Sequence, residues 1–158
     1  MSSTWRSKQD EPAEHPITAA GWLRVAWRGT VLGTIVFSGL GLLLALRLIE
    51  RPLFGLHRPW TPYITQSVCR SAFVVLRIRL DIRGDLMTRR GAVVANHSSW
   101  LDIFALNARK RVYFVSKAEV AAWPGIGWLA RATGTVFIKR DPKEARAQKA
   151  LFEERLLA

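Results

Sequence analysis

The longest apolar segment of the chain is residues 29–46 (GTVLGTIVFSGLGLLLAL), a run of 18 residues without a charge. As a helix this run would be about 27 Å long, close to the roughly 30 Å hydrocarbon core of a bilayer. Positive charges flank both of its ends, so the positive-inside rule gives no orientation. These charges are Arg24, Arg28, Arg47 and Arg51. The run predicts a membrane-associated helix, with a buried core helix as the alternative.

Two arrangements of this helix remain open. It can span the bilayer, or it can lie at one surface or dip in and return as a hairpin. Residues 48–56, interrupted by Pro52, are a candidate for part of the return. Residues 51–62 are rich in proline and arginine and predict a linker at the membrane surface. Residues 1–20 are polar, lack an apolar face and are expected to be flexible.

The rest of the chain alternates between patterns typical of strands and of helices. Residues 76–82 alternate apolar and charged side chains, which is the pattern of a half-buried strand. Further strands are expected at 92–95, 112–115 and 135–138, and helices at 64–75, 101–108 and 143–157. This order predicts an α/β fold, in which helices flank a sheet. The domains we expect are a flexible N-terminus (1–20), a membrane-associated helical segment with its linker (21–62) and the α/β part (63–158).

His97 follows the strand predicted at 92–95 and precedes a helix, a common place for reactive groups in α/β proteins. Asp102 comes five residues later, so the two side chains meet only if His97 lies in the loop and Asp102 in the first helical turn. The carboxylate can then accept one ring N–H and leave the other nitrogen as a base. The alternative is structural, because Ser99 and Asp102 also have the spacing of a helix-capping box.

The sequence around this pair resembles a known motif. Residues 96–102 (NHSSWLD) look like the His-x4-Asp motif of the glycerolipid acyltransferases, the PlsC-like lysophosphatidic acid acyltransferase family. Residues 134–140 (GTVFIKR) resemble the second motif of that family, a strand that ends in an arginine. The two motifs follow one another in the family's order, and the similarity extends from near Gly84 to near Asp141.

The resemblance implies a fold like that of glycerol-3-phosphate acyltransferase and a membrane-bound enzyme of phospholipid biosynthesis. His97 and Asp102 would be catalytic, and Arg140, Lys117 and Gly134 would bind the acceptor. The implied reaction moves a fatty acyl group from acyl-CoA or acyl-acyl carrier protein to lysophosphatidic acid, without a cofactor or metal. Lyso-ornithine lipid is the alternative acceptor. The implied location is the inner membrane, with the active site on the cytoplasmic side.

The family has a third, Pro-Glu-Gly-containing motif and a fourth, proline-centred motif, and neither occurs here. We therefore expect residues 63–158 to be the N-terminal part of an acyltransferase domain whose C-terminal part is missing. The expected activity of the 158-residue chain alone is low or absent. An inactive membrane protein that retains a remnant of the fold is the alternative from another functional class.

The charge of the chain points to an anionic partner. The chain has 24 Lys and Arg residues and 12 Asp and Glu residues, which gives a formal net charge of +12. Nucleic acid is a poor fit because the aromatic residues cluster with apolar ones, whereas membrane lipids suit the uncharged run. The single cysteine, Cys69, excludes an internal disulfide, and the three histidines lack metal-ligand spacing.

Overall fold

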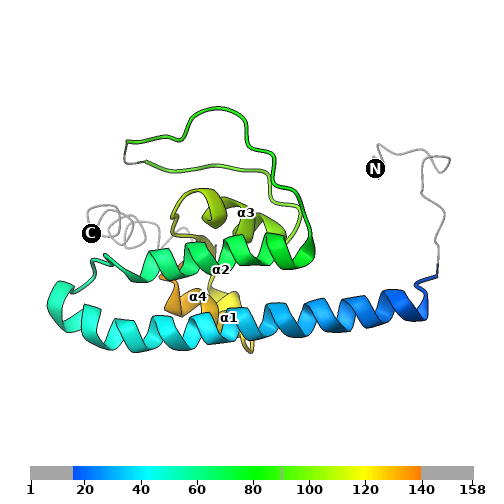
Figure 1. Ribbon diagram of the computed structural model, residues 1–158. Helices are drawn as coiled ribbons and strands as arrows, with labels where there is room; N and C mark the ends of the chain where they lie inside the picture. Colours follow the sequence, from blue (N-terminus) through cyan, green and yellow to red (C-terminus); the bar gives the residue numbers. More distant parts are fainter. Residues whose placement is uncertain (1–15, 90, 140–158) are drawn as a thin grey trace.

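The structure of the chain, a computed structural model, describes residues 16–89 and 91–139 (Figure 1). Within these residues the elements are four α-helices, two short strands and one 3-10 helix. In chain order they are α1 (Ala19–Phe54), α2 (Thr61–Leu76), α3 (Leu101–Arg109), β1 (Val115–Lys117), η2 (Ala118–Ala122), α4 (Ile126–Ala132) and β2 (Val136–Ile138). Mixed helices with a small parallel sheet agree with the α/β class that the sequence predicts. The predicted helix at 143–157 lies outside the described residues, as do residues 1–15.

Helix α1 contains the uncharged run and extends well beyond it, to 36 residues. It begins where Thr18 Oγ1 accepts a hydrogen bond from the N–H of Gly21 (3.2 Å) and ends at Gly55, whose φ of 61° a glycine adopts without strain. Among the described residues it is the one helix long and apolar enough to cross a membrane. Of its most apolar stretch of 18 residues, 6% is buried.

The return predicted at residues 48–56 is wrong, because α1 continues to Phe54. Pro52 lies in the last turn, where the missing N–H removes one bond from a helix about to end, so it does not break α1 earlier. Helix α2 makes the return instead, packed alongside α1 (Figure 1). The predicted helix at 64–75 is thus confirmed and longer, and the predicted linker at 51–62 shrinks to residues 55–60.

The turn between α1 and α2 is held by a buried carboxylate. Glu50 has no exposed surface. Its Oε1 accepts hydrogen bonds from the backbone N–H of Trp60 (2.8 Å) and Thr61 (3.2 Å), and its Oε2 accepts one from Thr61 Oγ1 (2.8 Å). These donors lie at the start of α2, where N–H groups lack partners within the helix and where negative charge is favourable. Glu50 therefore caps α2 from α1.

Arg47 completes this buried cluster. Its guanidinium pairs with Glu50 Oε2 (3.2 Å) and donates to the carbonyl oxygens of Gly55 (2.7 Å) and His57 (3.2 Å). The carbonyls released at the end of α1 thereby gain a cationic partner, and the Glu50 charge is balanced inside the protein. One ion pair ties both helix ends and the turn between them.

Helix α3 is fixed to α2 through its last carbonyls. Arg70 Nε donates to the carbonyl oxygen of Ala108 (2.9 Å), and Gln66 Nε2 donates to that of Arg109 (3.2 Å). Helix C-termini leave such carbonyls without intrahelical partners, so α2 satisfies them across the helix pair. The helix predicted at 101–108 is confirmed, and its position relative to the hairpin is set by α2.

The sheet consists of β1 and β2, which pair in parallel with Val115 opposite Val136 and Lys117 opposite Ile138. The strand predicted at 135–138 is confirmed, and the one predicted at 112–115 begins only at Val115. The strands predicted at 76–82 and 92–95 are wrong for the described structure. Described residues 77–98 are all exposed and include no strand, because no neighbouring strand accepts their backbone hydrogen bonds.

We predict that Glu50→Gln destabilises the helical hairpin by about 2–3 kcal/mol, because the change removes the charge that binds Arg47 and leaves buried donors with a weaker acceptor. Glu119→Gln is the matched control, since Glu119 is exposed on η2. The measurement is unfolding in detergent micelles, monitored through the rate of proteolysis at residues 55–60. Equal stability of the two variants would contradict the clamp.

Candidate active site

The contact that the sequence predicts between His97 and Asp102 is present. Nδ1 of His97 lies 3.0 Å from Oδ2 of Asp102. His97 is in the loop before α3 and Asp102 is in its first turn, the arrangement that the five-residue spacing requires. The side chain of His97 is 66% exposed and that of Asp102 30% exposed, so the imidazole is open to a partner from outside.

The same carboxylate oxygen also closes the start of α3. Oδ2 of Asp102 accepts hydrogen bonds from the backbone N–H of Ser98 (2.8 Å) and Ser99 (2.9 Å). Ser99 Oγ accepts one from the N–H of Leu101 (3.2 Å). The capping interpretation and the base-orienting interpretation of Asp102 therefore do not compete, because one oxygen makes both sets of contacts.

These contacts keep Asp102 ionised. The hydrogen bonds from the N–H groups of Ser99 and Ser98, with a smaller contribution from His97, hold the pKa of the Asp102 carboxyl below its usual value. A carboxylate only accepts hydrogen bonds, so the proton in the His97–Asp102 contact belongs to Nδ1 of the imidazole. In the neutral ring Nε2 then carries a lone pair and can act as a base.

An apolar surface adjoins this pair. Trp100, between His97 and Asp102 in the sequence, is 55% exposed and packs edge-on against Phe104, with ring centroids 5.5 Å apart. Ile103 on the same helix is 42% exposed. The imidazole therefore lies close in sequence to side chains suited to a hydrophobic substrate or a lipid surface.

The other predicted site residues are spread over the fold. Lys117 is exposed at the C-terminal end of β1. Gly134 is buried before β2, with a φ of 85°, where a β-carbon would lie 3.2 Å from Cζ of Arg58 and from the Tyr113 ring. Because the strands are parallel, these two residues lie at opposite edges of the sheet. Arg140 lies outside the described residues.

A polar cavity was not anticipated from the sequence. Its volume is about 200 Å³, and it lies between the hairpin and the segments before β1 and β2. Arg58 and Arg111 line it with Leu43, Thr61 and Tyr113 among others. Arg58 falls in the stretch predicted to be a linker, and its only sequence signal is the local excess of arginine. Within the described ranges no three His, Cys, Asp or Glu side chains are grouped closely enough to hold a metal ion.

Comparisons with known proteins add to this geometry. A family model described as Acyltransferase matches residues 77–157. The chain is 60% identical over 147 residues to the lyso-ornithine lipid O-acyltransferase of Rhodobacter capsulatus, an alignment that covers 93% of this chain and 53% of that protein. It is 35% identical over 134 residues to the protein of the same name from Pseudomonas aeruginosa, covering 85% of this chain and 52% of the relative.

A shorter match concerns a different acceptor. The chain is 47% identical over 51 residues to the 1-acyl-sn-glycerol-3-phosphate acyltransferase of Neisseria gonorrhoeae. This alignment covers 32% of this chain and 20% of that protein. No solved structure matches the chain significantly. The chain spans about half the length of the curated relatives that it matches over most of its own length.

We predict that the amide resonances of Ser98 and Ser99 titrate with a midpoint below about 3.9, the ordinary pKa of aspartate. Because the pKa of Asp102 is lowered in the folded chain, its stabilisation of α3 is fully present above about pH 4 and is lost as the pH falls through the lowered pKa. NMR in micelles measures the midpoint, and in Asp102→Asn this titration should vanish. A midpoint above 4 would contradict the hydrogen-bonded carboxylate.

Proposed function

The chain belongs to the Acyltransferase family, as its two motifs predicted, and we propose that it carries the general base of a membrane-bound enzyme that esterifies a lysolipid. The observation that carries this proposal is the hydrogen bond between His97 Nδ1 and Asp102 Oδ2, which lies inside the family-matched region. Residues 63–158 are then part of the acyltransferase domain, and residues 21–62 attach it to the membrane.

The proposed reaction needs one base and no acylated enzyme. Nε2 of His97 takes the proton of the acceptor hydroxyl as the hydroxyl oxygen attacks the thioester carbonyl. When the C–S bond breaks, the departing thiolate receives that proton from His97, so the products are an ester and a free thiol. Asp102 holds the Nδ1–H and stabilises the imidazolium that forms between the two steps. No step requires a metal or another cofactor.

We favour lyso-ornithine lipid as the acceptor over lysophosphatidic acid. The two relatives with that name described above align with 93% and 85% of this chain, whereas the match to the 1-acyl-sn-glycerol-3-phosphate acyltransferase covers 32% of it. Either acceptor presents an anion, a carboxylate or a phosphate. In this proposal Arg140 and Lys117 bind that anion, since a guanidinium fork suits both groups, and Gly134 belongs to the acceptor-binding motif.

The acyl donor is acyl-CoA or acyl-acyl carrier protein, and the membrane is the inner membrane, with the active site on its cytoplasmic side. The formal charge of +12 supports contact with anionic lipid and equally with an acidic carrier protein. Helix α1, whose apolar surface is mostly exposed, supports the membrane attachment.

The activity test grafts this chain in place of the aligned 147 residues of the Rhodobacter capsulatus relative, which supplies the rest of that protein. We predict that His97→Gln lowers acyl transfer from labelled acyl-acyl carrier protein or acyl-CoA to lyso-ornithine lipid by about a hundredfold or more. His57→Gln, in the turn between α1 and α2, is the matched control and retains activity. Equal turnover in the two variants would remove His97 from the reaction.

The acceptor is tested on the 158-residue chain itself, so that the grafted partner cannot bias the result. We predict that the chain in lipid nanodiscs retains lyso-ornithine lipid roughly tenfold more tightly than lysophosphatidic acid, a difference of about 1.4 kcal/mol. Native mass spectrometry with both lipids in competition measures the ratio, and Lys117→Gln should weaken the retention of both lipids, because this side chain binds the anion that either acceptor presents. Stronger retention of lysophosphatidic acid would contradict this choice and favour an enzyme that forms phosphatidic acid.

A further inference from the structure

The residues that join η2 to α4, together with the first residues of α4, expose large apolar side chains. Trp123, Ile126 and Trp128 are 54%, 52% and 60% exposed. We call residues 123–128 the tryptophan segment. Two glycines shape it: Gly125 has a φ of 71°, and a β-carbon at Gly127 would overlap the carbonyl oxygen of Ala121. The chain therefore folds tightly against η2 while it leaves three apolar side chains on the surface.

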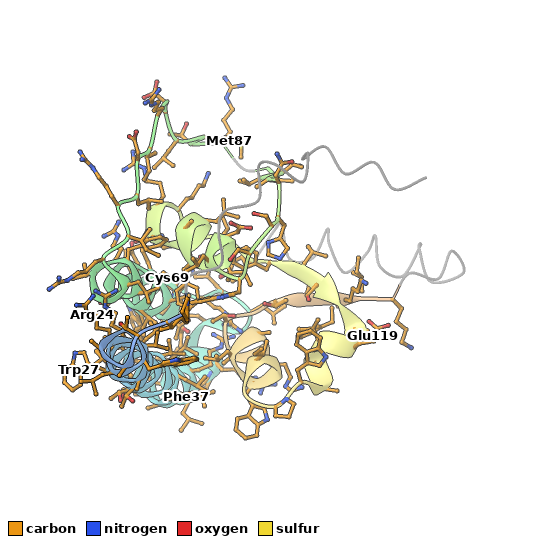
Figure 2. All side chains as sticks on the ribbon, turned by 90° about the vertical axis from the view of Figure 1, so that its right-hand side faces the viewer. Arg24, Trp27, Phe37, Cys69, Met87 and Glu119 are labelled. Carbon is orange, nitrogen blue, oxygen red and sulfur yellow. The ribbon has the colours of Figure 1, made fainter. Side chains whose placement is uncertain are left out.

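The tryptophan segment lies against the middle of α1. A β-carbon on Gly125 would be 3.8 Å from Cζ of Phe37, and Phe37 is itself 52% exposed near the centre of the uncharged run. Figure 2 shows Phe37 and α4 together on the lower side of the molecule, whereas Met87 in the long loop lies on the opposite side. In Figure 1, α1 runs along the lower side of the molecule with α2 and α3 above it, and α4 overlaps the middle of α1 in this view.

From this arrangement we propose that the tryptophan segment is a second membrane contact, and that α1 lies along the bilayer surface rather than across it. The partner is the lipid interface, where indole rings are favoured because one part of the ring is apolar and the N–H stays near water. The segment lies beside the exposed Phe37 of α1, and the arginines at the ends of the uncharged run suit anionic headgroups.

A spanning orientation conflicts with these contacts. If α1 crossed the bilayer, Phe37 would lie near its centre, together with the tryptophan segment and the adjoining η2 and α4. Irregular backbone facing lipid leaves polar groups without partners. Glu119 on η2 and Arg131 on α4 would also enter the hydrocarbon, where a charged side chain is strongly unfavourable. With α1 in the plane of the interface, these groups remain near water.

The first experiment measures the depth of a nitroxide label at Ile126→Cys in a Cys69→Ala background, in vesicles of phosphatidylethanolamine and phosphatidylglycerol. Leu44→Cys on α1 and Leu86→Cys in the long loop are matched controls, with exposures of 49% and 42% against 52% for Ile126. We expect the label at 126 to match that at 44, more accessible to oxygen than to a water-soluble nickel complex, and the label at 86 to show the reverse.

Two results would overturn the membrane contact. Preferential access of the nickel complex to the label at 126 would place the segment in water. Shielding of that label from both reagents, with the label at 44 in lipid, would mean that protein covers the segment. Neither result depends on acyl transfer, so this inference can fail while the proposed function stands.

The orientation of α1 is tested with Leu23→Cys and Leu53→Cys, near its two ends and 72% and 65% exposed. In sealed inverted inner-membrane vesicles, an impermeant maleimide added outside should modify both cysteines, because an in-plane helix has both ends on one side. Modification of only one end would show that α1 crosses the bilayer or enters it at one end, and would overturn the in-plane arrangement.

Discussion

The buried carboxylate of Glu50 is the interaction on which the described structure depends. It joins the end of α1 to the start of α2, with Arg47 as its counter-charge. Helix α2, held in place by this contact, binds the last carbonyls of α3 through Gln66 and Arg70. Helix α3 in turn begins with the carboxylate that orients the imidazole of His97. The geometry of the exposed site thus rests on an ion pair buried at the far end of the hairpin.

The carboxylates of Glu50 and Asp102 both cap helices, but they do so in different environments. Glu50 and Asp102 each accept backbone N–H groups at a helix start, where partial positive charge accumulates. Glu50 is enclosed, so it needs Arg47 to balance its charge. Asp102 is partly exposed, so solvent and His97 are enough to balance its charge. Its contact with the imidazole is through Nδ1, which leaves Nε2 without a contact to this carboxylate.

Local features of the fold were predictable from the sequence, and features that depend on distant partners were not. The uncharged run and the His97–Asp102 contact depend only on residues close together in the sequence, so short-range spacing was enough to predict them. Residues 76–82 have the alternation of a strand, yet a strand forms only where another accepts its hydrogen bonds, and the described chain offers none there. Glu50 was missed for a related reason: its partners lie ten and eleven residues onward, across a turn whose geometry no periodicity reveals. The catalytic roles stay predictions.

The capping of α3 also bears on how the site can change during evolution. Oδ2 of Asp102 is held by the peptide groups of Ser98 and Ser99, and peptide groups are common to nearly all amino acids. The side chain at position 98 is therefore free to vary around a fixed imidazole, with proline as the exception because it has no N–H. Drift at this position can retune the surroundings of the reacting lipid without disturbing the group that takes the proton.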